Sequence, residues 1–142
     1  MSEFISHRLI ADPASDREAA PKAVPEQLRA SFAWGGLYRY FVARDGVRLR
    51  HALWRLPPGV ARAGRVIVLG GRGEFTDKYA GELVGELLGR GWEVHAMDWR
   101  GQGLSQRLLD DPEKGYVADF ADYAADLKQY LEEVVTRAPG VK

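Results

Sequence analysis

Alternating hydrophobic and polar positions on either side of an Asp-Gly pair predict a β-hairpin. The first run, residues 37–42, is rich in aromatic and β-branched residues, and Asp45-Gly46 follows it. The second run, residues 47–55, alternates between two sets of positions. The first set is Val47, Leu49, His51 and Leu53, and the second is Arg48, Arg50 and Ala52. We expect Pro57-Pro58-Gly59 to end the second strand.

The next hydrophobic runs predict a parallel strand-helix-strand unit. Arg65–Leu69 is apolar at every position after the arginine, which is typical of a strand buried on both faces. Apolar residues then recur at helical spacing from Thr76 to Gly89, and Thr76 or Asp77 is expected to cap that helix. Trp92–Asp98 reads as the following strand.

A loop of glycines and charged residues is expected from Trp99 to about Val117, followed by a second helix. We expect Asp119 to cap this helix and Pro139-Gly140 to end it. Its predicted apolar stripe consists of Phe120, Tyr123, Leu127, Leu131, Val134 and Val135. The order of elements, a hairpin and then β-α-β-α, predicts a three-layer α/β fold with at least one parallel strand pair.

Residues 1–34 have a different character, being polar and rich in alanine and proline. Pro13, Pro21 and Pro25 would interrupt any long helix, so we expect a flexible N-terminal arm. A lid or a partner-binding segment is the functional alternative, because long irregular segments often carry function. The folded domain is expected over residues 35–142.

Charge and composition narrow the function further. Among 142 residues, 20 Lys and Arg balance 20 Asp and Glu, and this argues against a nucleic-acid or anionic-membrane partner. The chain has no cysteine and no His/Asp/Glu cluster at metal-ligand spacing, so neither a metal nor another cofactor is expected. It has no apolar run of membrane-spanning length and no signal-peptide pattern, which predicts a cytoplasmic protein.

Gly70, Gly71 and Gly73 follow the predicted apolar strand and precede a predicted helix. Backbone amides in such a place bind either a phosphate or the oxyanion of an acyl-transfer intermediate. The dinucleotide-binding fingerprint needs a glycine where Thr76 stands, and Asp98 lies 27 residues past Gly71 instead of about 20. The sequence also lacks a P-loop pattern. A tight turn without chemistry remains the structural alternative.

Two separated motifs resemble the α/β-hydrolases, and the closest branch is the lysophospholipase and monoacylglycerol-lipase group, which is of the serine aminopeptidase type. The first motif is 71–79, GRGEFTDKY, and the second is 98–107, DWRGQGLSQR. The segment 115–127 also resembles the family's approach to its next helix. The resemblance covers about residues 36–138 and implies the N-terminal part of an α/β-hydrolase fold with an incomplete sheet.

The family's nucleophile is a serine in G-x-S-x-G, after a strand expected just past Pro139-Gly140. The chain has five serines, Ser2, Ser6, Ser15, Ser31 and Ser105. Ser105 comes nearest to the motif, but Arg107 occupies the last glycine position. We therefore expect Ser105 to hydrogen-bond within its loop, and we expect this chain alone to be inactive.

The remaining candidate residues have modest roles. By resemblance, the backbone N–H of Arg72 donates to the oxyanion in the complete enzyme, and the Arg72 side chain either contacts a substrate headgroup or is solvated. His95 and His51 are expected in strands and His7 in the arm, none of them catalytic. Glu74 is expected to pair with Arg100 and so join the two loops.

The resemblance therefore implies an N-terminal fragment of a serine hydrolase acting on lysophospholipid or monoacylglycerol esters. It carries the oxyanion loop but lacks the nucleophile, acid and histidine. The alternative is a non-catalytic α/β interaction module or a nucleotide-binding module. In the family's sheet the strand Arg65–Leu69 lies between Trp92–Asp98 and a fifth strand that this sequence lacks. One edge of Arg65–Leu69 would then be bare, so self-association through that edge is also expected.

Overall fold

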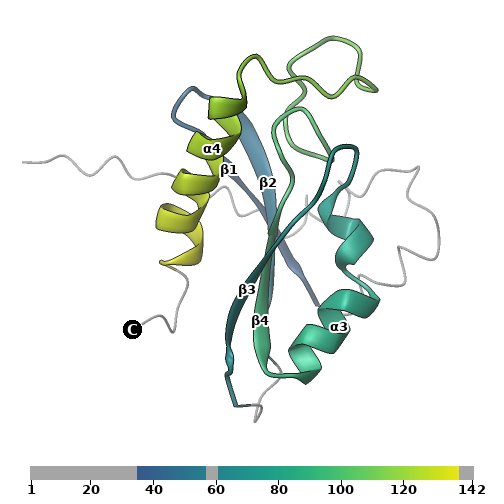
Figure 1. Cartoon of the computed structure of the whole chain (residues 1–142), viewed down its shortest axis with the longest axis vertical. Coiled ribbons are helices and arrows are strands. Elements are labelled where there is room, and N and C mark those ends of the chain that lie inside the picture. Colours follow the sequence, from purple (N-terminus) through teal and green to yellow (C-terminus); the bar gives the residue numbers. More distant parts are fainter. Residues whose placement is uncertain (1–34, 57–60, 138–142) are drawn as a thin grey trace, which may run out of the picture.

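The computed structural model describes residues 35–56 and 61–137. In these ranges one mixed sheet has the strand order β1-β2-β4-β3, with helices against both of its faces (Figure 1). The strands are β1 (Leu37–Val42), β2 (Arg48–Trp54), β3 (Gly64–Leu69) and β4 (Trp92–Met97). The helical segments are η2 (Thr76–Tyr79), α3 (Glu82–Gly89), α4 (Phe120–Gln129) and η3 (Tyr130–Val135). The predicted arm 1–34, Pro57-Pro58-Gly59 and Pro139-Gly140 lie outside the described residues.

The predicted hairpin is confirmed. β1 and β2 pair antiparallel with Val42 opposite Arg48. The Ala43 N–H donates to the Val47 carbonyl at 2.8 Å, which closes the turn. Gly46 has φ +89°, a left-handed conformation that glycine adopts without steric cost, so the Asp-Gly pair suits this turn.

The predicted parallel pair is also confirmed, since β3 and β4 run parallel with Gly64 opposite Trp92 and Leu69 opposite Met97. β3 is an edge strand of the described sheet and is mostly half-buried. The prediction that it is buried on both faces is therefore wrong. β2 lies between β1 and β4 and is buried on both faces, so its alternating basic positions do not mark a solvent face.

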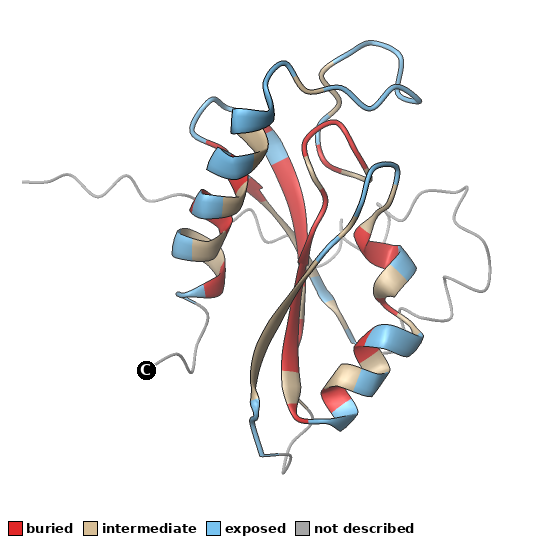
Figure 2. Cartoon of the chain, viewed as in Figure 1, coloured by how far each residue is buried: buried red, intermediate tan, exposed pale blue. Residues whose placement is uncertain are grey.

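Two hydrophobic clusters on opposite faces of the sheet make the three layers, and Figure 2 shows buried residues concentrated along the central strands. Under α3 the cluster contains Ala52, Trp54, Ala80, Val84, Leu88, Val94 and Ala96. Under α4 and η3 it contains Phe41, Ala43, Val47, Leu49, Met97, Tyr130 and Val135. The predicted α/β class and layer order are confirmed. None of the helices within the described ranges is long and apolar enough to cross a bilayer.

The first predicted helix is interrupted. A 3-10 turn, η2, occupies Thr76–Tyr79, and the α-helix begins only at Glu82 after Gly81. Neither Thr76 nor Asp77 caps a helix, because both are buried and bind side chains of other elements. The predicted end at Gly89 is confirmed.

The second helix begins as predicted, since the Asp119 carboxylate accepts the Ala121 N–H at 2.8 Å. Most of its predicted stripe is confirmed, because Leu127, Leu131, Val134 and Val135 pack in the core under this helix. The prediction fails at Phe120 and omits Tyr130. Phe120 is 80% exposed, whereas Tyr130 is fully buried. The helix continues from Tyr130 as the π-helical segment η3, and the Tyr130 ring joins the predicted residues in the core by stacking on Phe41.

Candidate active site

Two loops meet at the carboxyl ends of β3 and β4, the place where open α/β sheets commonly bind ligands. The loop 70–75 follows β3, and the loop 98–117 follows β4. Between them lies a cavity of about 890 Å³. Its lining is largely apolar and aromatic on the side of the second loop and α4, with Trp99, Leu104, Tyr116, Val117, Phe120 and Tyr123.

Backbone amides of the first loop differ in their partners. The Gly71 N–H donates to Glu74 Oε2 at 2.9 Å, and the Gly73 N–H donates to Gln102 Oε1 at 2.7 Å. The Arg72 N–H between them donates to no acceptor in the described part of the chain, and Arg72 lines the cavity. The Arg72 amide is therefore left without a protein acceptor beside the cavity, between two amides that have one.

Glu74 fixes the first loop from within. Its carboxylate accepts hydrogen bonds from Lys78 and the Tyr79 hydroxyl as well as from the Gly71 N–H. The bond from Lys78, followed by that from Tyr79, lowers the pKa of Glu74 to about 2. The bond to Glu74 raises the pKa of Tyr79 to about 12. The predicted Glu74–Arg100 pair is wrong, because each residue has nearer partners.

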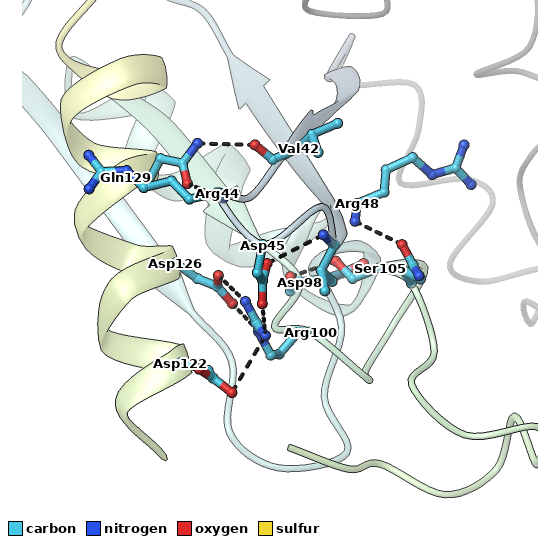
Figure 3. Close-up of polar contacts among 12 residues, drawn as sticks. Val42, Arg44, Asp45, Arg48, Asp98, Arg100, Ser105, Asp122, Asp126 and Gln129 are labelled. Atoms are coloured by element: carbon cyan, nitrogen blue, oxygen red, sulfur yellow. Dashed lines mark hydrogen bonds and ion pairs between the residues drawn. The ribbon is translucent and has the colours of Figure 1, made fainter. Parts of the chain in front are cut away.

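Arg100 binds the C-terminal helix instead (Figure 3). Its Nε and Nη2 each donate to the Asp126 carboxylate at 2.7 Å, and Nη1 donates to Asp45 at 2.7 Å. Arg100 and Asp126 are both buried. The hydrogen bond to Arg100 lowers the pKa of Asp45. The bidentate pair with Asp126 connects the second loop to α4, and the hydrogen bond to Asp45 connects it to the hairpin turn.

Asp98, at the end of β4, joins the two loops. Its Oδ1 accepts both the N–H and the hydroxyl of Thr76, at 2.6 and 2.7 Å, and its Oδ2 accepts the Leu104 N–H at 2.9 Å. A side chain at Gly103 would bring Cβ to 2.4 Å from this carboxylate, and Gly103 has φ +52°, so glycine is required there. Arg50 lies 3.6 Å from Asp98 and forms a bidentate pair with Asp77.

Ser105 is a structural residue, as its sequence context predicts. Its Oγ accepts the Arg50 N–H at 2.8 Å and donates to the Asp98 carbonyl at 2.7 Å, and the residue is 4% exposed. The hydroxyl is therefore committed to backbone partners and inaccessible to a substrate. Figure 3 shows it beside Asp98, beneath the hairpin.

The histidines of the sheet also lie away from the cavity. His51 and His95 are 3% and 1% exposed in β2 and β4, and neither lines the cavity. Burial, with His95 and Arg39 nearby, lowers the pKa of His51 to about 3, so this ring stays neutral. His7 lies outside the described residues. Among those that the structure describes, no three or more metal-ligating side chains gather.

Sequence reasoning missed three residues of the site. They are Asp77, the buried partner of Arg50, Asp126, the buried partner of Arg100, and Gln102, whose amide oxygen accepts the Gly73 N–H. Asp126 carried a weak signal, since it lies on the predicted helix three residues after Tyr123 and three before Gln129, on a face that is buried. Gln102 stands within the second motif, but its contact with Gly73 depends on how the two loops approach each other.

Comparison with known proteins places this geometry in context. Residues 61–142 match the family described as serine aminopeptidase, S33. Lysophospholipase L2 of Escherichia coli K12 is 43% identical over 74 residues, which are 52% of this chain and 22% of that protein. A probable lysophospholipase L2 of Haemophilus influenzae is 30% identical over 96 residues, 68% of this chain and 29% of that protein.

Solved structures agree on the fold. A soluble variant of monoglyceride lipase from Saccharomyces cerevisiae, in complex with a substrate analog, superposes with a TM-score of 0.55 and 26% identity, covering 72% of this chain and 31% of that one. A probable hydrolytic enzyme from Pseudomonas aeruginosa PAO1 superposes with a TM-score of 0.53 and 21% identity, covering 73% of this chain and 31% of that one. The chain thus spans less than a third of the length of each of these relatives.

Proposed function

The chain belongs to the serine aminopeptidase S33 family of α/β-hydrolases, and from that premise we propose that it is the N-terminal part of a carboxylic-ester hydrolase. The proposed substrates are lysophospholipids or monoacylglycerols. Two relatives support this class by name, a lysophospholipase and a monoglyceride lipase. The largely apolar and aromatic side of the cavity suits a single acyl chain.

The observation that carries the proposal is the unpaired Arg72 N–H at the cavity, between two amides that are hydrogen-bonded. When a nucleophile attacks an ester carbonyl, negative charge develops on the carbonyl oxygen. A fixed amide donor stabilises that charge, and this is the oxyanion function. Glu74 and Gln102 fix the amides on either side, so Arg72 need not reorganise during the reaction.

The attacking serine, the acid and the histidine are proposed to come from outside the described residues. Ser105 is buried with its hydroxyl bound to backbone groups, and the histidines of β2 and β4 are buried in the sheet. In the complete hydrolase the serine would form an acyl-enzyme, which water then cleaves. The role of this chain is to provide one oxyanion donor and one wall of the acyl site.

A fluorophosphonate probe, which labels activated serines covalently, tests this division of roles. The 142-residue chain is expected to remain unlabelled and to show no ester hydrolysis above the buffer blank. The complete hydrolase is expected to be labelled at a serine outside this sequence. Labelling of the 142-residue chain that disappears in Ser105→Ala would contradict the proposal, as would absence of ester hydrolysis by the complete protein.

A further inference from the structure

The cavity is lined by one basic residue from each loop in addition to its apolar and aromatic residues, and only one of the two guanidinium groups is bound within the described residues. Arg72 and Arg107 are its basic lining residues. Arg107 donates to the carbonyls of Gly101 and Gly103, so its guanidinium is occupied within the second loop. The Arg72 side chain has no hydrogen-bond or ion-pair partner among residues 35–56 and 61–137.

Two carboxylates also line this cavity, Asp77 and Glu113. Asp77 is neutralised by its bidentate pair with Arg50, at 2.5 and 3.0 Å. Glu113 lies on the second loop, opposite the loop of Arg72, and is exposed. The charge of Arg72 is therefore left for a ligand, whereas the other charges near the first loop are paired.

We propose that the Arg72 guanidinium binds the phosphate of a single-chain phospholipid and so makes the site selective for lysophospholipids over neutral monoacylglycerols. This inference rests on the proposed function, because it assumes that an ester carbonyl binds at the Arg72 N–H. Arginine suits the task, since its planar fork of donors matches a phosphate in a bidentate manner.

The covalent geometry of residue and substrate agrees with this arrangement. In an sn-1 lysophospholipid the phosphorus lies as many bonds from the ester carbonyl carbon as the guanidinium carbon lies from the amide nitrogen of an arginine. One residue can therefore reach both ends of the polar part of the substrate. Its amide binds the carbonyl oxygen, and its guanidinium binds the phosphate. The acyl chain then extends toward Trp99, Tyr116 and Phe120 on the other side of the cavity.

Binding to the 142-residue chain tests this selectivity without any catalytic step. The probes are 1-octanoyl-glycerol-3-phosphate and 1-octanoyl-glycerol, both kept below their critical micelle concentrations, with inorganic phosphate as a third ligand. We expect the phosphate-bearing lipid to bind about tenfold tighter than the neutral lipid, as one charge-assisted contact would give. Inorganic phosphate alone is expected to bind far more weakly than the lipid. Equally tight binding of inorganic phosphate would show an anion site and overturn the lipid assignment.

Variants then assign the effect to the side chain. Arg72→Ala is expected to bind the two lipids with equal affinity, and Arg72→Lys to retain part of the preference. Arg90→Ala is the matched control, because Arg90 is an exposed arginine of the α3 end that pairs with Glu86 away from the cavity. Circular dichroism and thermal melting verify that each variant is folded. A preference that persists in Arg72→Ala, equal binding of both lipids by the unaltered chain, or binding of neither would overturn the inference.

Failure of this inference and failure of the proposed function have different signatures. If the complete protein hydrolyses esters but Arg72→Ala leaves the ratio of KM values for the two lipids unchanged, the selectivity is wrong and the hydrolase proposal stands. If the complete protein hydrolyses no ester but the chain still prefers the phosphate-bearing lipid through Arg72, the binding assignment stands and the hydrolase proposal is wrong.

Discussion

Asp98 accepts two hydrogen bonds from Thr76, one from its backbone N–H at 2.6 Å and one from its hydroxyl at 2.7 Å. Thr76 begins η2 after the first loop, and Asp98 begins the second loop. This contact therefore sets the distance between the two loops that form the cavity. Asp98 is 1% exposed, so these donors and Arg50 nearby take the place of water around its carboxylate.

Replacing Asp98 with alanine is expected to destabilise the fold by about 3–5 kcal/mol, because it leaves buried donors and a buried arginine without their partner. Asp98→Asn retains an acceptor oxygen for Thr76 and is expected to lose less stability than Asp98→Ala. Urea denaturation measures the difference. Asp111→Ala, on the exposed part of the second loop, is the control and should change stability little. Equal stability of Asp98→Ala and the unaltered chain would contradict this role.

The buried pair of Arg100 and Asp126 gives a second stability test. Asp126→Ala removes the buried carboxylate and leaves Arg100 with the more exposed Asp45 and Asp122. We therefore expect a loss of about 3 kcal/mol in the free energy of unfolding. Lys128→Ala removes an exposed ion pair of the same helical segment, with Glu132, and should cost below about 0.5 kcal/mol. Similar losses in the two variants would show that the buried pair stabilises the fold no more than the exposed one.

Sequence patterns predicted the turns and helix ends that are determined by residues close together in the chain. Asp45-Gly46 predicted the turn because only a few residue pairs favour its backbone, and Asp119 predicted the helix start because its carboxylate caps a nearby amide. Parallel pairing of β3 with β4 followed from the strand-helix-strand order. These features depend on residues close together in the chain.

Features that depend on distant partners could not be predicted. Thr76 and Asp77 have the residue types of helix caps, but Asp98 and Arg50 bind them and a 3-10 turn results. Glu74 and Arg100 have opposite charges on neighbouring loops, yet each finds a closer partner. The backbone amide of Arg72 was singled out by resemblance, and its lack of a partner became visible only in the folded loop.

His51 predicts a pH dependence of stability. Its pKa is about 3 in the folded chain, mainly through burial, against 6.5 for an exposed histidine. The unfolded chain therefore binds the proton more readily, so stability is full above pH 6.5 and falls as the pH decreases toward 3. We expect a slope of up to about 1.4 kcal/mol per pH unit from this residue.

Urea denaturation at pH 7, 6 and 5 measures that slope above the range in which most carboxylates titrate. His51→Phe should flatten the profile, because phenylalanine has no proton to gain. The pKa of His95 is also lowered by burial, so a remaining slope should disappear in a variant that replaces both rings. A profile that is as steep with both rings replaced would assign the pH dependence to other groups.

The edge position of β3 predicts self-association of the 142-residue chain. Its outer backbone groups have no partner strand in the described sheet, and Leu69 at its end is 38% exposed. Sedimentation at tens of micromolar should detect species larger than a monomer. Leu69→Lys should reduce them, whereas Leu83→Lys, at a similarly exposed position on α3, should not. A strictly monomeric chain would refute this prediction.

The central claim, that the Arg72 N–H stabilises the oxyanion, is tested most directly by comparing Arg72→Pro with Arg72→Ala in the complete hydrolase on a neutral monoacylglycerol. Proline removes the amide donor and alanine retains it. After wild-type circular dichroism and melting are verified for both, Arg72→Pro should lose on the order of 10²–10³-fold in kcat, and Arg72→Ala no more than a few-fold. Equal kcat values in the two variants would contradict the claim and place the oxyanion donor elsewhere.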